Sequence, residues 1–317
     1  MLHIQRIDSF DLPELAPYRT LRYQFAHRDQ GIFVAEGEKV VRRLIESRLP
    51  VVSLMLPEKW LPDFQQHLAR RVEDITVFVG AKELLEQLTG FTMYQGVLAV
   101  GKVPPQPSLE TVLQAGSRPL LLLAADELSN AQNMGVLVRN CAAFAANALL
   151  VGETCCSPFL RRAVRASMGT VFTLPVIEVG NELLSHRGQR RQKARPELQD
   201  ENGERMEAAA RDPAPPPVGA DGLAETIRQL RTHGVRCIAA HPHTDKRTLP
   251  QADFRGDCCI VLGSEGQGIN PAVLEQCDEA VAVPMPPDVD SLNVGSASAV
   301  FLYEAARQRG TMARADW

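Results

Sequence analysis

The chain has 317 residues, a net charge of −4, 45% hydrophobic and 23% charged residues, a composition typical of a globular protein with about two domains. The negative charge excludes attraction of nucleic acid by a global positive field, and an aromatic share of 5% argues against a platform that stacks many bases. Any nucleic-acid contact must then come from local clusters, whose ordinary interpretation is solvated helix faces. The candidates are Arg19, Arg22 and Arg28; Arg42 and Arg43; and Arg161, Arg162 and Arg165.

Residues 1–102 alternate between helical and strand patterns, which predicts a small α/β domain. Three closely spaced prolines, at 104, 105 and 107, mark a linker at 103–118, and Ser108 is the expected N-cap of a short helix within it. We predict strands over 32–35, 51–56, 76–79 and 96–100, and helices over 11–28, 38–48, 60–71, 82–88 and 109–114.

Residues 119–317 continue the α/β pattern in a second unit. Its first apolar run, 120–123, is typical of a strand buried on both faces. We predict further strands over 148–151, 172–176, 236–240, 259–262 and 280–283, and helices over 134–144, 158–168, 223–233, 271–275 and 294–308.

The stretch 185–221 interrupts this pattern, because it is charged, rich in proline and nearly free of large apolar residues. Such a segment buries too little surface to order itself, so we expect a disordered insertion. Its ordinary interpretation is a tolerated surface insertion. The alternative is that its basic half binds nucleic-acid phosphates through Arg187, Arg190, Arg191, Lys193 and Arg195.

Cysteine usage and the N-terminus indicate a reducing compartment. Seven cysteines occur, two pairs of them adjacent and none spaced C-x-x-C, which fits neither a zinc site nor a disulfide framework. The N-terminus lacks the apolar region of a signal peptide, and no apolar run of about 18 residues could span a membrane. We therefore expect a cytoplasmic protein with buried thiols and no membrane segment.

Two segments near the C-terminus each join an apolar strand to a loop of small and polar residues: CIVLGSEGQG at 259–268, and VAVPM at 281–285 running on to SLNVGSA at 291–297. Glycine lets a ligand approach the backbone, and two such loops predict one pocket at the ends of neighbouring strands. GSEGQG matches neither a dinucleotide nor a phosphate-loop pattern, so alone it could be a plain turn. Glu265, held between glycines, favours a ligand site.

Four further residues have an ordinary interpretation beside a functional one. Ser291 and Asn293 lie at the start of the last helix and could merely cap it. Asn133 lies at the N-terminal end of a predicted helix and Arg139 lies six residues further, well inside it, so they could be a cap and a surface arginine. These residues gain a function only if the chain folds them into one site.

Taken in chain order, the segment 133–139 (NMGVLVR) and the two C-terminal segments resemble the SpoU (TrmH) family of RNA ribose 2′-O-methyltransferases, in the SPOUT superfamily. Residues 165–170 (RASMGT) resemble another recurrent family segment, and 33–37 (FVAEG) resemble the start of a ribosomal-protein-L30e-like substrate-binding domain. The resemblance implies a small L30e-like α/β domain over 1–102 and an α/β-knot, trefoil-knotted methyltransferase domain over 119–317. Ordinary topology rules argue against knots, so the knot rests on the resemblance alone.

The resemblance also implies roles for residues. Gly263, Val283 and Leu292 would contact S-adenosylmethionine, largely through backbone groups. Asn133, Arg139, Glu265, Ser291 and Asn293 would form the catalytic and RNA-facing set. The implied activity is methylation of a ribose 2′-OH in rRNA or tRNA by a homodimer whose site lies near the subunit interface. The alternatives are a non-catalytic RNA-binding or ribosome-assembly protein that keeps the fold, and a nucleotide-dependent oxidoreductase, against which the absence of G-x-G-x-x-G argues.

The chain departs from the family pattern at three places. Asn130 and Ala131 stand where Asp-Pro is frequent, and Gly295 stands where Ser is common; both departures put substrate choice in doubt. Ala145 replaces a frequent Gly, which we interpret as a packing position.

Two chemical questions stay open in the sequence. Arg139 could take the hydroxyl proton, for which a guanidinium pKa above about 12 is a poor match, or it could grip the adjacent phosphate and orient the hydroxyl. His241, His243 and Asp245 could suggest a metal site, but His-Pro-His places the imidazoles awkwardly and no third strong ligand is obvious, so we expect no metal there. We expect these residues to flank the pocket.

Overall fold

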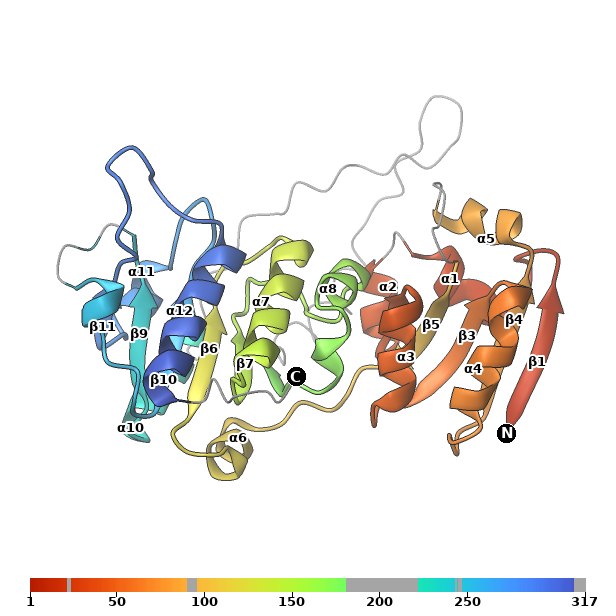
Figure 1. Ribbon diagram of the computed structural model, residues 1–317, viewed down its shortest axis with the longest axis horizontal. Coiled ribbons are helices and arrows are strands. Elements are labelled where there is room, and N and C mark those ends of the chain that lie inside the picture. The colour runs from red at the N-terminus through yellow and green to blue at the C-terminus, as the bar shows by residue number, and fades with distance from the viewer. Residues whose placement is uncertain (22–23, 90–95, 181–221, 243, 245–246, 311–317) are drawn as a thin grey trace, which may run out of the picture.

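The computed structural model describes residues 1–21, 24–89, 96–180, 222–242, 244 and 247–310. Two sheets follow one another along the long axis in Figure 1. Five helices form a row on the side turned to the viewer: α12 (Val294–Arg309), α7 (Ala131–Ala143), α8 (Arg161–Ala166), α3 (Glu38–Glu46) and α4 (Leu61–Leu68). The predicted insertion at 185–221 lies outside the described residues. None of the helices in the described ranges is long and apolar enough to cross a membrane.

The first sheet has five strands in the order β1-β4-β3-β5-β2. Strands β1, β4 and β3 run parallel, whereas β5 is antiparallel to both β3 and β2. The strands are β1 (Leu2–Ile7), β2 (Ile32–Glu36), β3 (Val51–Leu56), β4 (Ile75–Gly80) and β5 (Leu98–Lys102), and the main helices are α3 (Glu38–Glu46), α4 (Leu61–Leu68) and α5 (Lys82–Thr89). These elements agree with the prediction except for β1, which the sequence did not reveal because most of its residues are exposed.

The predicted single helix over 11–28 is wrong. The chain forms a 3-10 turn at Pro13–Leu15, then α1 (Ala16–Arg19) and α2 (Gln24–Asp29). The Thr20 hydroxyl donates to the Ala16 carbonyl at 2.8 Å, at the point where α1 ends. A side-chain hydroxyl that bonds the preceding turn offers the backbone an alternative to continuing the helix.

The second sheet has six parallel strands in the order β11-β9-β10-β6-β7-β8, which confirms the predicted α/β fold class. The strands are β6 (Leu121–Ala125), β7 (Ala148–Val151), β8 (Val176–Glu178), β9 (Arg236–Ala240), β10 (Cys258–Leu262) and β11 (Glu279–Val281). All residues of β6, β7 and β10 are buried, as expected of strands covered on both faces. The strand predicted over 172–176 is wrong, because a 3-10 turn occupies Thr170–Phe172 and β8 begins only at Val176.

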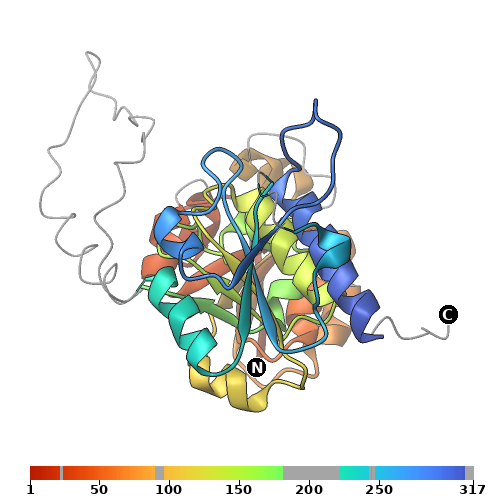
Figure 2. The same ribbon diagram turned by 90° about the vertical axis from the view of Figure 1, so that its left-hand side faces the viewer.

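Helices cover both faces of this sheet, as Figure 2 shows. On one face lie α7 (Ala131–Ala143), α8 (Arg161–Ala166) and α12 (Val294–Arg309). On the other lie α6 (Leu109–Ala115), α10 (Leu223–Thr232) and α11 (Pro271–Leu274). Ser108 caps α6 as predicted, since its hydroxyl accepts from the Thr111 N–H at 3.1 Å.

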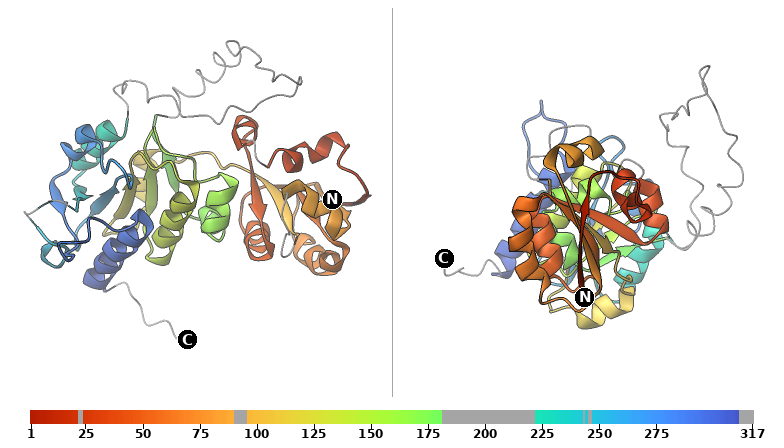
Figure 3. Two further views of the ribbon diagram at one scale, coloured as in Figure 1. Left: turned by 90° about the horizontal axis from the view of Figure 1, so that it is seen from above. Right: turned by 90° about the vertical axis from the view of Figure 1, so that its right-hand side faces the viewer.

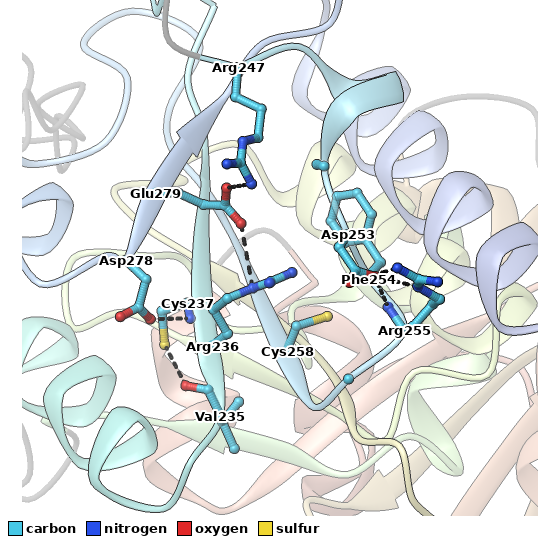
Figure 4. A network of polar contacts seen from close by, with 12 residues as sticks. Val235, Arg236, Cys237, Arg247, Asp253, Phe254, Arg255, Cys258, Asp278 and Glu279 are labelled. Carbon is cyan, nitrogen blue, oxygen red and sulfur yellow. Dashed lines mark hydrogen bonds and ion pairs between the residues drawn. The ribbon is translucent and has the colours of Figure 1, made fainter.

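The chain just after β11 is hydrogen-bonded on both sides. The His241 N–H donates to the Val281 carbonyl at 3.0 Å, and Ala282 makes backbone bonds with Arg247 at 3.0 Å and Leu249 at 2.8 Å. Figure 4 shows two ion pairs of Glu279, the first residue of β11. One carboxylate oxygen lies 2.7 Å from Arg247 Nη1 and the other lies 3.4 Å from Arg236 Nε. The chain at the end of this edge strand therefore lies between β9 and the segment 247–249. The trefoil knot that the resemblance implies stays a prediction.

The two sheets are joined by a shared apolar core and a buried ion cluster. The ring of Phe33 on β2 stacks on Phe172 at 5.3 Å and meets Phe159 at 5.5 Å. Beside these rings, the carboxylate of Glu36 is only 7% exposed and accepts from both Arg161 and Arg165 of α8. Figure 3 shows β2 at this junction from above. The boundaries expected at 102 and 119 stay a prediction.

Candidate functional site

A cavity of about 500 Å³ opens at the carboxyl ends of β9, β10 and β11. Two loops form most of its wall, residues 262–269 after β10 and residues 281–294 before α12. The three predicted cofactor contacts, Gly263, Val283 and Leu292, all line this one cavity, and so do Glu265, Ser291 and His241. The parallel sheet explains the convergence, because the ends of neighbouring strands open on the same edge.

Three predicted site residues meet through their side chains at this edge. The carboxylate oxygen Oε1 of Glu265 accepts from the Nδ2 groups of both Asn133 and Asn293, the latter at 2.9 Å. Asn293 Nδ2 also lies 3.4 Å from Asn133 Oδ1. The three residues come from the first turn of α7, the loop after β10 and the start of α12. We call Asn133, Glu265 and Asn293 the amide–carboxylate cluster.

The loop 263–268 closes on itself by two backbone hydrogen bonds. Ser264 N–H donates to the Gly268 carbonyl at 2.9 Å, and Gly268 N–H donates back at 3.0 Å. A Cβ on Gly263 would lie 2.1 Å from the carbonyl carbon of Gly268, far inside contact distance. The sequence-based explanation of this glycine is close approach of a ligand. The structure gives a direct steric reason, because the two limbs of the loop leave no room for a side chain.

The asparagine that caps α7 is a different one from the cap that the sequence suggested. Asn130, not Asn133, caps α7, since its Oδ1 accepts from the backbone N–H of Gln132 at 2.8 Å and of Asn133 at 3.3 Å. Asn133 is thereby left inside the first turn, where its side chain reaches Glu265. Asn293 both caps α12, accepting from the Gly295 N–H at 2.9 Å, and donates to Glu265. Because Asn and Asp cap equally well, Asn130 can do what a family Asp would do.

The other two departures have structural explanations. A Cβ on Gly295 would lie 2.7 Å from Val136 Cγ1, so glycine lets α12 approach α7 closely. Asn140 of α7 donates to the Gly295 carbonyl at 2.8 Å across the same crossing. Ala145 has φ of +53°, a left-handed conformation that favours glycine. The interpretation of position 145 as a packing position is therefore wrong, because its backbone conformation explains the glycine that is frequent there.

Arg139 is not brought to the amide–carboxylate cluster. Its side chain is exposed, and six residues of helix separate it from Asn133, about 9 Å along the axis of α7. Within the part of the chain that the structure describes, no hydrogen bond or ion pair joins Arg139 to the cluster. A role in the same reaction requires that a ligand or a second subunit bridge this distance.

Asp126, which the sequence reasoning missed, lies next to this edge of the sheet. It follows β6 directly, is 4% exposed, and accepts from the Asn270 N–H at 2.7 Å. Burial raises the pKa of its carboxyl to about 6, against the opposing effect of the Asn270 hydrogen bond and with a smaller contribution from the charges of Glu127 and Glu153. A polar residue at the carboxyl end of the buried apolar run 121–125 was the signal that could have identified it.

The described residues hold no group of three His, Cys, Asp or Glu side chains arranged as metal ligands. His241 lines the cavity, whereas His243 and Asp245 lie outside the described residues. Burial raises the pKa of the Cys155 and Cys156 thiols to about 12, so both stay protonated at neutral pH.

Comparison with known proteins places this geometry in context. The family model described as SpoU rRNA Methylase matches residues 120–187 and 192–303. A Mycobacterium tuberculosis protein named an uncharacterized tRNA/rRNA methyltransferase is 27% identical over 313 residues, which covers 96% of this chain and 93% of that protein. The 23S rRNA (guanosine-2′-O-)-methyltransferase RlmB of Acinetobacter baylyi is 27% identical over 241 residues, covering 74% of this chain and 79% of its own.

Solved structures share the whole fold. A structure titled RNA 2′-O ribose methyltransferase superposes with a TM-score of 0.68 at 23% identity, covering 98% of this chain and 99% of that one. The SpoU methyltransferase AviRb from Streptomyces viridochromogenes, solved in complex with AdoMet, gives a TM-score of 0.68 at 22% identity, with 96% and 100% covered. At these identities the likeness establishes the fold.

Proposed function

The chain belongs to the SpoU rRNA Methylase family, and from this membership we propose that it transfers a methyl group from S-adenosylmethionine to a ribose 2′-OH of rRNA or tRNA. The observation that carries the proposal is the amide–carboxylate cluster at the mouth of a cavity whose walls are the two predicted cofactor loops. Relatives named for 2′-O-methylation of guanosine in 23S rRNA favour a ribosomal substrate. Such a substrate would place the protein in the cytoplasm.

The cavity suits S-adenosylmethionine in size and lining. A volume of about 500 Å³ is in the range of small-molecule sites. Leu262, Ile269 and Phe301 supply apolar surface for a flat ring, and the loops around Gly263 and Leu292 supply backbone groups for polar ends. When bound, the cofactor supplies an electrophilic methyl group on a sulfonium.

The amide–carboxylate cluster would then hold the ribose. Two amide N–H groups fix one oxygen of Glu265, so the carboxylate is oriented before RNA arrives. An oriented carboxylate beside the cofactor loops can accept a hydrogen bond from a ribose hydroxyl and align its oxygen with the methyl group. It can also take up the hydroxyl proton as the O–CH3 bond forms and the S–CH3 bond breaks. Positioning of this kind supplies much of the acceleration of a transfer between two bound reactants. We assign Ser291, which lines the same cavity, to the RNA-facing side of this cluster.

Arg139 is assigned to the phosphate next to the target ribose rather than to proton removal. Its guanidinium stays charged at any physiological pH and is a poor base. A planar guanidinium instead matches a phosphate with two parallel hydrogen bonds. The other role that the sequence left open, in which Arg139 removes the hydroxyl proton, therefore has less support than phosphate binding.

We further propose a homodimer formed through the exposed side of α7 and α12. On α12, Val300 and Tyr303 are 36% and 47% exposed and present apolar surface to the solvent. The ring of Tyr303 meets Phe144, at the end of α7, edge-on at 6.3 Å. We propose that a second copy packed on this surface places its own Arg139 beside the first copy's cluster.

The direct test is transfer of a tritiated methyl group to total RNA from a strain that lacks the gene. We expect label in nucleotides that resist alkaline cleavage, because a 2′-O-methyl group blocks attack of that oxygen on the adjacent phosphate. Cofactor binding is measured alongside by calorimetry. Binding of S-adenosylmethionine without any transfer to RNA would favour the alternative of a non-catalytic RNA-binding or assembly protein.

A further inference from the structure

Two of the predicted arginine clusters fall on neighbouring helices, α3 and α8, and the structure separates their members into two kinds. Arg42 is engaged by Glu38 and Asp63, and Arg161 by Glu36, with 12% of the Arg161 side chain exposed. These two arginines stabilise the fold. The remaining cations are exposed to solvent. They are Lys39 and Arg43 of α3 and Arg162 and Arg165 of α8, which we call the junction ridge.

A chain of hydrogen bonds and one ion pair ties α3 to α8 at the junction ridge. Arg43 Nη1 donates to the Met168 carbonyl at 2.7 Å, and the Met168 N–H is bonded to the Arg165 carbonyl at 3.0 Å. Arg165 in turn pairs with Glu36, three residues before Lys39. Figures 1 and 3 show α3 and α8 next to one another where the two sheets meet.

The ridge carries a surplus of positive charge in a chain whose net charge is −4. Glu36 is buried beneath it and is shared by Arg161 and Arg165, so one carboxylate faces two guanidinium groups. Glu46, one helical turn after Arg43, is exposed and offsets one further charge, and the second of the two carboxylates that engage Arg42 offsets another, which leaves a surplus of two positive charges. The clustering of charge is therefore local, as a phosphate-binding surface on an acidic protein requires.

The ridge continues toward the site along α7. Gly135 of α7 packs against α8 so closely that a Cβ there would lie 2.3 Å from the Ala163 carbonyl oxygen and 2.7 Å from Ala166 Cβ. Arg139 follows Gly135 by one helical turn and therefore lies on the same side of α7. A strand of RNA on the ridge would run from α3 across α8 to Arg139.

We propose that the junction ridge binds the phosphate backbone of the substrate RNA and guides it from the first sheet to Arg139. This inference rests on the proposed function and names a surface that the function leaves unassigned. Guanidinium groups favour phosphate as the ligand. The Phe33 ring stack and the buried Glu36 fix α3 relative to α8, so the ridge presents its cations at set spacings. Contacts to phosphates position the RNA without reading its sequence.

The test compares two charge-matched double variants of the full chain. Lys39→Ala with Arg162→Ala removes two exposed ridge cations. Arg228→Ala with Arg255→Ala is the control, because these side chains are 58% and 73% exposed and pair with carboxylates of their own segments, Glu225 and Asp253. Arg43 is left intact because it braces Met168. The probe is protein-free ribosomal RNA from a strain lacking the gene, measured by filter binding at several salt concentrations.

We expect the ridge variant to bind this RNA at least about tenfold more weakly than the control, with a salt slope smaller by about 2, one for each phosphate that the ridge no longer neutralises. The KM for RNA should rise while turnover at saturating RNA stays within about twofold, because the ridge positions and does not react. An RNA affinity and a salt slope equal to those of the control variant would overturn the proposal. The ridge would then be a candidate binding surface for an acidic protein partner. The binding assay needs no catalysis, so its result is separate from the methyl-transfer test, in which inactivity of the unmodified protein contradicts the proposed function.

Discussion

The side chain of Asn293 uses its oxygen and its nitrogen for different tasks, and one substitution separates them. Asn293→Asp keeps the oxygen that caps α12 but replaces the donor to Glu265 by a second carboxylate. We expect a folded protein whose methyl transfer falls at least about a hundredfold, the low end for loss of one positioned catalytic group. Thermal unfolding and the tritium assay measure the two effects.

The matched control for this substitution is Asn130→Asp, which makes the same chemical change at the other helix start. The Asn130 side chain caps α7, where it accepts from the backbone N–H of Asn133, but within the described residues no hydrogen bond joins it to the side chains of the amide–carboxylate cluster. Methyl transfer by Asn130→Asp should stay within about twofold, because Asp caps a helix as well as Asn does. Equal activities for the two variants would remove Asn293 from the site and leave it as a cap.

Asp126 provides a prediction about pH. Burial raises the folded-state pKa of its carboxyl to about 6, above the value of about 3.9 for an unfolded chain. The folded protein therefore holds this proton more tightly, so the stabilisation is complete below about pH 4 and is lost as pH rises toward about 6. Above that range the charged carboxyl lowers the free energy of unfolding by on the order of 2–3 kcal/mol.

Asp126→Asn should remove this loss while retaining an acceptor for the Asn270 N–H. We expect the variant to gain stability relative to the unmodified protein between about pH 4 and pH 6 and to hold that gain at pH 8. Urea unfolding of both proteins at pH 4.5 and pH 8 measures the difference, in which the titration of all other groups cancels. A stability difference that is the same at both pH values would contradict the assignment.

At the level of elements, the shape of the closed loop 263–268 is sensitive to the addition of one methyl group at Gly263. Gly263→Ala places a Cβ against the backbone of Gly268 and should open the loop, weakening S-adenosylmethionine binding by about tenfold or more. Gly266→Ala is the control, since a Cβ at Gly266 meets nothing within 4 Å. Calorimetric titration of both variants with the cofactor decides the matter. Comparable affinities would show that the loop shape is unimportant for binding.

Local sequence patterns predict the helices and strands whose caps and apolar periodicity match their burial in the fold. The strand Arg236–Ala240 has the same bounds in the prediction and in the structure, and α12 agrees within one residue, because an Asn cap and a continuous buried stripe mark it. The strand expected over 172–176 fails for a backbone reason. Met168 and Gly169 both adopt positive φ, of 54° and 82°, which turns the chain into a 3-10 segment before β8 begins. An apolar run alone does not reveal such a turn.

The sequence can nominate residues for the candidate site but not their arrangement. Motif resemblance selects Asn133, Glu265 and Asn293, and the structure places both amides on one oxygen of the Glu265 carboxylate. The contact depends on the order β9-β10-β6, which sets the loop after β10 beside the start of α7. Strand order is a property of long-range pairing that no local spacing encodes. The distance from Arg139 to Asn133, by contrast, follows from their spacing along one helix.

For the whole molecule, the position of Arg139 makes a prediction about subunits. If Arg139 serves the partner's cluster, chains carrying Arg139→Ala and chains carrying Asn293→Asp should complement each other when they assemble together. A mixed dimer then holds one intact site, so random assembly should restore about a quarter of the unmodified activity. Each variant alone should be at least about a hundredfold less active.

Coexpression with two different affinity tags, followed by the tritium assay, measures this recovery. Arg139→Lys in place of Arg139→Ala should give no more activity alone, because an ammonium cannot reproduce a two-pronged grip on phosphate. Stable mixed dimers without recovered activity would show that Arg139 acts within its own chain. A monomer in solution would contradict the proposed α7 and α12 interface.

The order in which the cluster residues occur along the chain has a consequence for how the protein is made. Asn133 and Glu265 are synthesised first, but the amide that completes the cluster belongs to Asn293, the N-cap of a helix that ends at Arg309. That helix also packs across α7 through Gly295 and Asn140. A nascent chain can therefore hold its substrate in a working geometry only after α12 has left the ribosomal tunnel.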